Sequence, residues 1–211
     1  RSFGDPDEDA DIGMGKGWMH SWSGRIKLPK YYDARYPSSL AVLLPDGTSA
    51  LFLKEMGEQS PWLPATGTDI LMPQGGGWQY NRSSDGSWWK FDNKGWLTQV
   101  TLRNGWNYNI LQTNGKVLSV ANSFGRGLSF SYRTDGRLGS VTLPDGNAVN
   151  YDYNAKGSLS SVKVNSYQTH AYSYGNITFP GLVTAVGDAQ GNQILGFTYN
   201  PDGSLKETTR A

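Results

Sequence analysis

Five aspartates of this chain directly precede a glycine, and a pair of such carboxylates could serve as the acid and base of a glycoside hydrolase. That reaction needs two carboxyl groups roughly 5–10 Å apart across the scissile bond. Asp-Gly is also a preferred dipeptide of tight β-turns, because glycine adopts the positive φ that these turns require. We therefore interpret all five aspartates as turn residues: Asp46, Asp85, Asp135, Asp145 and Asp202.

Other reactive groups are scarce in the sequence. The chain has no cysteine, no Gly-x-Ser-x-Gly motif and only two histidines, His20 and His170, the second in an apolar slot that favours packing. The acidic run from Asp5 to Asp11 lacks the glycine and glutamate spacing of an EF-hand, which favours a solvated loop. The Gly13-x-Gly15-x-Gly17 segment lacks the Lys-Ser/Thr of a phosphate loop. We expect no catalytic residue, no metal site and no cofactor.

Aromatic side chains are the remaining candidates for ligand contact, since tryptophan rings can stack on sugars as well as pack on a sheet. Packing is the favoured interpretation, because aromatic residues supply much of the buried area in thin β structures. Contact with a sugar or an enclosed polypeptide stays open as an alternative for four of them: Trp78, Trp88, Trp96 and Trp106.

A repeat of about 21 residues must position these groups. The pattern Gly-x-(Leu/Val)-x-x-Val recurs with glycines separated by 20, 21, 21, 24 and 22 residues, and its last copy ends in Thr208. The glycines are Gly95, Gly115, Gly136, Gly157, Gly181 and Gly203. Such regular spacing indicates one structural unit per period.

The other half of each period reads apolar-x-aromatic-x-Tyr with small or polar residues between, a period-two alternation typical of strands. Asp-Gly and Asn-Gly pairs separate the two halves, so each period predicts one β-hairpin. We expect successive hairpins to pair into one continuous, curved antiparallel sheet in which aromatic side chains form rows. The row residues are Tyr132, Tyr151, Tyr153, Tyr172, Tyr174, Phe197 and Tyr199.

The N-terminal part shares this chemistry without its clean period. Pro45-Asp46-Gly47 and Asp85-Gly86 predict hairpin turns, and Gly75-Gly76-Gly77 marks an irregular connection. We divide the chain into an irregular, cap-like β module over residues 1–87 and hairpin repeats over residues 88–211.

Composition excludes several classes of partner. A net charge of +1, from 19 basic and 18 acidic residues spread along the chain, offers no basic stripe for nucleic acid. No apolar run approaches the roughly 20 residues of a membrane-spanning helix, and the chain opens without a signal peptide.

The repeat residues resemble a known family. Tyr132 to Leu138 followed by Val141, and Tyr153 to Leu159 followed by Val162, resemble the YD repeat of RHS proteins, and the likeness covers about residues 88–211. Gly15-Lys16-Gly17-Trp18 resembles the module that precedes the repeats in many members. The aspartate that follows the tyrosine in the family pattern is replaced by Arg133 or Asn154 here.

This resemblance implies a spiral shell of hairpins that encloses a toxic C-terminal domain, as in bacterial effectors delivered to other cells. We therefore expect a non-enzymatic scaffold, secreted or on the cell surface, whose partners are the rest of the shell and its toxin cargo. Carbohydrate binding by exposed tryptophan and tyrosine rows is the alternative.

Overall fold

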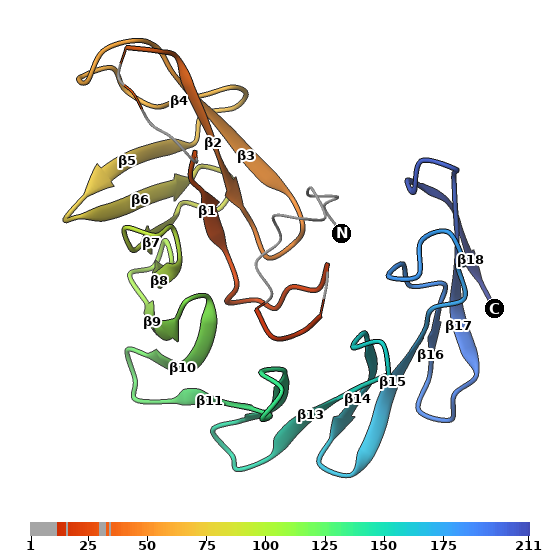
Figure 1. Ribbon diagram of the computed structural model, residues 1–211. Coiled ribbons are helices and arrows are strands. Elements are labelled where there is room, and N and C mark those ends of the chain that lie inside the picture. The colour runs from red at the N-terminus through yellow and green to blue at the C-terminus, as the bar shows by residue number, and fades with distance from the viewer. Residues whose placement is uncertain (1–11, 16, 30–32, 34) are drawn as a thin grey trace. The chain divides into compact units, whose positions relative to one another are not determined.

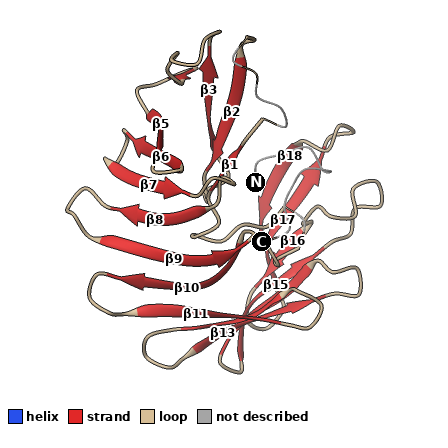
Figure 2. Ribbon diagram, turned by 60° about the vertical axis from the view of Figure 1, so that its left-hand side comes forward, coloured by secondary structure: helices blue, strands red, loops and turns tan. Residues whose placement is uncertain are grey.

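The computed structural model describes residues 12–15, 17–29, 33 and 35–211, so the acidic run from Asp5 to Asp11 lies outside the described residues. Within the described part every regular element is a β-strand, and Figure 2 shows strands joined by loops with no helix among them. The prediction of an all-β fold built from consecutive antiparallel hairpins is confirmed.

The first sheet of the described chain has four antiparallel strands, each paired with its neighbour in sequence (Figure 1). Its strands are β1 (Arg25–Lys27), β2 (Ser38–Leu43), β3 (Ser49–Lys54) and β4 (Leu63–Pro64). Leu40 and Val42 of β2 and Phe52 of β3 point to its buried face, since their exposed fractions are 3% or less. Two isolated bridges, between Trp62 and Leu71 and between Arg25 and Trp96, link this sheet to the second one.

The second sheet has fourteen strands in strict sequence order, with β5 and β18 at its two ends. Its strands are β5 (Ile70–Gln74), β6 (Gly77–Arg82), β7 (Ser87–Phe91), β8 (Leu97–Thr101), β9 (Asn107–Thr113), β10 (Lys116–Asn122), β11 (Gly127–Tyr132), β12 (Leu138–Thr142), β13 (Ala148–Tyr153), β14 (Leu159–Val164), β15 (Tyr167–Ser173), β16 (Ala185–Gly187), β17 (Gln193–Tyr199) and β18 (Leu205–Arg210). Neighbouring strands run antiparallel, which is the arrangement that short hairpin turns produce.

The repeat glycines lie in the turns, as the β12 hairpin illustrates. Gly136 has a φ of +80° and donates its amide hydrogen to the carbonyl of Arg133 at 2.9 Å. The register then shifts by one residue where Tyr132 pairs with Leu138, and the same shift recurs where Tyr153 pairs with Leu159. The repeat therefore encodes a bulged hairpin, which explains why glycine and leucine keep a constant separation.

The chain forms two compact units. The N-terminal unit contains residues 18–128 with Ile12, and the C-terminal unit contains residues 129–211 with the segment 13–17. In the N-terminal unit the core lies between the two sheets: the Phe52 and Tyr80 rings meet edge to face at 6.1 Å, and Tyr80 meets Trp89 at 6.4 Å. Phe52 and Tyr80 have no exposed surface, so truncating either to alanine is expected to cost about 3–5 kcal/mol.

The division at residues 87/88 and the spiral curvature stay predictions.

Candidate binding face

Tyrosine hydroxyl groups tie successive hairpins together in the C-terminal unit. Tyr153 donates to the Leu138 carbonyl at 2.9 Å, Tyr174 to the Leu159 carbonyl at 2.7 Å, and Tyr199 to the Val183 carbonyl at 2.6 Å. In each case the acceptor is the leucine or valine that follows the preceding repeat glycine by two residues. The last tyrosine of the aromatic pattern therefore donates a hydrogen bond to a backbone carbonyl of the preceding repeat. This bond helps to keep the strands of the two repeats in register.

The turn glycines allow close approach of a neighbouring segment. A methyl group on Gly115 would lie 2.6 Å from the Trp96 ring, and one on Gly203 would lie 3.3 Å from the Phe179 ring. Gly95 lies against the backbone of Ile26, whose amide hydrogen bonds to the Gly95 carbonyl at 2.8 Å. Any side chain at these positions would push the neighbouring segment away.

The five Asp-Gly carboxylates accept backbone hydrogen bonds within their own turns. Each accepts a hydrogen bond from the backbone amide two residues ahead, at 2.9–3.0 Å: Asp46, Asp85, Asp135, Asp145 and Asp202. The amide of Arg137 lowers the pKa of Asp135, and the hydroxyl of Ser204 lowers the pKa of Asp202. A general acid in glycoside hydrolysis needs a raised pKa, so the pKa values of Asp135 and Asp202 are shifted in the opposite direction.

In the C-terminal unit, one face of the fourteen-stranded sheet is only partly shielded from solvent, and we call it the open face. It consists of apolar and aromatic side chains on β13 to β17: Val149, Tyr151, Val162, His170, Tyr172, Val186, Leu195 and Phe197. Strand pairing places them side by side, since Tyr151 lies opposite Val162, and Tyr172 lies opposite Val186. All but His170 are intermediate in exposure, and His170 is exposed. Four strand spacings make this face roughly 19 Å wide.

At equivalent repeat positions the N-terminal unit is more buried. Val100 and Val120, each the last residue of its repeat pattern, expose 6% and 2% of their surface, whereas Val162 and Val186 of the C-terminal unit are intermediate in exposure. A loop contributes to this cover, since the Trp22 ring packs on Tyr108 with centroids 5.0 Å apart. The two units thus share one strand pattern but differ in how far its apolar face is shielded from water.

Aromatic rings line the middle of the open face. The His170 and Tyr172 rings lie nearly parallel, at 12°, with centroids 6.5 Å apart. Burial raises the pKa of Tyr151, with a further contribution from Tyr172, and burial also raises the pKa of Tyr172. Both tyrosines are therefore neutral over the physiological range, so the face offers ring surfaces and hydroxyl groups without phenolate charge.

The four tryptophans proposed as sugar or cargo contacts lie apart. Trp78 packs edge to face on Trp62 at 5.9 Å, and Trp96 lies under the Arg25 guanidinium at 5.7 Å. Trp88 is half-buried in β7. Trp106 is half-exposed and forms an edge-to-face pair at 5.1 Å with Phe124, which is 62% exposed. Sequence reasoning missed Phe124, although its place in a turn equivalent to that of Asn104-Gly105 offered a signal.

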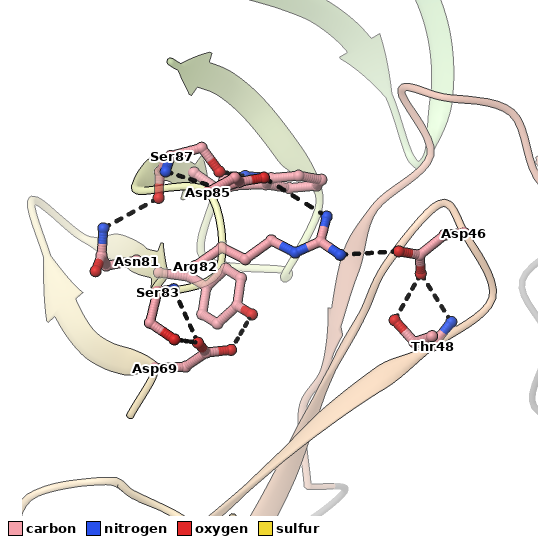
Figure 3. A network of polar contacts seen from close by, with 10 residues as sticks. Asp46, Thr48, Asp69, Asn81, Arg82, Ser83, Asp85 and Ser87 are labelled. Carbon is pink, nitrogen blue, oxygen red and sulfur yellow. Dashed lines mark hydrogen bonds and ion pairs between the residues drawn. The ribbon is translucent and has the colours of Figure 1, made fainter. Parts of the chain in front are cut away.

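A polar network in the N-terminal unit was also not anticipated (Figure 3). Asp69 accepts a short hydrogen bond from the Tyr80 hydroxyl and two more from the amide and hydroxyl of Ser83 at 2.9 and 2.6 Å. Burial and this carboxylate raise the pKa of Tyr80. Arg82 reaches across to Asp46 in the β2–β3 turn at 3.0 Å. The network joins the two sheets, and nothing in residue spacing pairs positions 36 residues apart.

Two further features are absent from the described residues. No group of three or more His, Cys, Asp or Glu side chains there could hold a metal ion. That part of the chain also has no helix long and apolar enough to cross a membrane.

No family model matches the chain, and no curated protein matches it. Among solved structures it is similar to a chain of the Photorhabdus luminescens Tc holotoxin pore with a mutated TccC3, at 12% identity and a TM-score of 0.39. The match covers 82% of this chain and 11% of that chain. Membership of the RHS family therefore stays a prediction from the repeat residues.

Proposed function

We propose that this chain is a non-enzymatic scaffold of the RHS kind that holds a polypeptide against the open face of its hairpin sheet. The observation that carries the proposal is the half-exposed row of aliphatic and aromatic side chains on five adjacent strands. Water contact with such a continuous row is unfavourable, at roughly 25 cal/mol per Å² of apolar surface. Contiguous apolar patches of this kind mark interaction surfaces.

The shape of the face favours a polypeptide over a small molecule. A row roughly 19 Å wide matches an extended chain of about six residues, at 3.3 Å per residue. Small-molecule sites are instead concave, with a few convergent polar groups. In the wider proposal, further RHS repeats complete a shell, the polypeptide is a C-terminal toxin, and the assembly is secreted or presented at the cell surface.

The proposal is tested by titrating the chain with fluorescein-labelled casein, an unfolded polypeptide, and following fluorescence anisotropy. Leu195→Ser on the open face is expected to weaken binding about tenfold, since it removes roughly 1.5–3 kcal/mol of apolar contact at full burial. Ile194→Ser is the matched control, because Ile194 is the preceding residue of β17, is 40% exposed and does not belong to the open face. Equal affinity of the two variants, or no binding by the unmodified chain, would contradict the proposal.

A carbohydrate-binding function is the second candidate, and the Trp106–Phe124 pair favours it. Two neighbouring exposed rings offer a stacking platform of the kind that sugars use. Calorimetric titration with a panel of oligosaccharides is expected to give millimolar or tighter binding that Trp106→Ala abolishes. Tyr167→Ala serves as the control, because Tyr167 is a single ring with an exposed fraction of 81%. A panel without binding would remove this candidate.

A further inference from the structure

A short N-terminal segment, residues 13–15, belongs to the C-terminal unit, and we call it the strap. The Gly13 carbonyl accepts two hydrogen bonds there, from the Leu138 amide at 2.6 Å and from the Tyr153 hydroxyl at 3.1 Å. The same hydroxyl also lies 2.9 Å from the Leu138 carbonyl. Tyr153 therefore joins the strap and two successive hairpins at one point.

The two strap glycines fit against two successive turn glycines. A methyl group on Gly13 would lie 2.7 Å from a Tyr132 ring carbon and 3.1 Å from the Gly136 carbonyl oxygen. A methyl group on Gly15 would lie 2.8 Å from the carbonyl oxygen of Gly157. Gly13 and Gly15, two residues apart in the strap, therefore contact the turn glycines of two successive repeats, which are 21 residues apart in sequence.

The hydrogen bonds and the close packing of this contact define which peptide fits it. The strap supplies a backbone acceptor, and the sheet leaves no room for a side chain at either glycine, each of which has a φ that disfavours other residues, +91° and +82°. Met14 between them exposes only 4% of its surface. The fitting ligand is a peptide in which glycines flank one apolar residue.

We propose that the turn edge formed by Gly136, Leu138, Tyr153 and Gly157 is a peptide-recognition site for a Gly-apolar-Gly segment, and that the strap is its occupant in this chain. The site is separate from the open face and does not depend on the function proposed above. Because its partners are 140 residues apart in sequence, it adds a long-range contact to a sheet whose strands each pair with their neighbours in sequence.

Glycine substitution tests the steric part of the site in the full chain. Gly13→Ala is expected to speed hydrogen exchange at least tenfold in the peptide that contains the Leu138 amide. Gly146→Ala is the matched control, because Gly146 has a similar φ of +86° but no atom within 4 Å of the added methyl. Equal acceleration at Leu138 in both variants would overturn the proposal, since backbone strain alone would then account for it.

A second pair of variants removes a hydroxyl group without adding bulk, so folding is not at risk. Tyr153→Phe removes a hydroxyl group that lies within hydrogen-bond distance of the carbonyls of both Gly13 and Leu138, whereas Tyr174→Phe removes the equivalent bond to Leu159. Tyr153→Phe is expected to increase exchange in the strap peptide several-fold, and Tyr174→Phe to leave it unchanged. An unchanged strap in Tyr153→Phe would contradict the assignment of Gly13 to this site.

Recognition itself is tested in trans with a synthetic peptide of residues 10–19. Added to the Gly13→Ala chain, this peptide is expected to slow exchange at Leu138 toward the rate of the unmodified protein. A peptide with alanine at the positions of Gly13 and Gly15 is expected to have no effect. Failure of the first peptide, or equal effects of both, would overturn the proposal.

Discussion

Tyr174→Phe examines the hydroxyl contacts that link successive hairpins. The substitution deletes one oxygen, which donates to the Leu159 carbonyl at 2.7 Å, and keeps the ring. A neutral hydrogen bond contributes about 1 kcal/mol net, and a buried acceptor left without its donor costs about 1–3 kcal/mol. Leu159 exposes only 1% of its surface, so we expect a loss of about 1–2 kcal/mol in the free energy of unfolding.

Thermal unfolding followed by circular dichroism measures this loss. In a chain of this length 1 kcal/mol corresponds to about 2–4 °C in Tm, so Tyr174→Phe is expected to lower Tm by about 2–8 °C. Tyr151→Phe is the matched control. Tyr151 lies in β13 of the same sheet, and no hydrogen bond of its hydroxyl is seen in the described part of the chain. Its expected change is below about 0.5 kcal/mol. Equal Tm values for the two variants would refute the role of the hydroxyl group.

Three further outcomes follow from the contacts described. Tyr80→Phe removes a hydrogen bond to the Asp69 carboxylate and is expected to cost about 1.5–3 kcal/mol in urea unfolding; an unchanged midpoint would contradict this. Burial lowers the pKa of His20 from 6.5 to about 4, so stability is highest above pH 6.5 and falls as the pH drops toward 4, by at most about 3 kcal/mol. His20→Gln should flatten that part of a stability–pH curve, and an identical curve would argue against it. Gly115→Ala, which collides with an indole ring, should destabilise the chain by about 1–3 kcal/mol more than Gly105→Ala, which meets open space at a similar φ; equal losses in the two would contradict the close contact.

The sequence predicted the hairpin pattern because the repeat restricts both halves of each period. Gly136, Leu138 and Val141 lie where a bulged turn and the following strand need them, and Tyr153 ends the next strand. The repeat that contains Gly115 departs from the pattern. Gln112 takes the position of the terminal tyrosine, donates to Asp92 at 2.8 Å and accepts the Gly115 amide at 3.0 Å. A two-residue turn after Thr113 makes this exchange of tyrosine for glutamine possible.

Long-range contacts could not be read from spacing. The glycine spacing of the Gly13-x-Gly15 segment indicated only a weak likeness to a phosphate loop. Its contacts with the sheet were not predicted, because its partners lie more than 120 residues away in sequence. The open face was also not localised: Val162 and Val120 are each the last residue of the same repeat pattern, but Val162 is half-buried and Val120 is buried. Exposure depends on what covers a strand, and the strand's own residues do not contain that information.

Site-specific photo-crosslinking tests the binding face most directly. A benzophenone side chain is introduced at Leu195 in one variant and at Ile194 in another, and each is irradiated with fluorescein-labelled casein. The proposed scaffold function predicts a crosslinked product from position 195 and little from position 194, since Ile194 does not belong to the open face. Equal crosslinking at both positions, or a product from position 194 alone, would contradict binding at the open face.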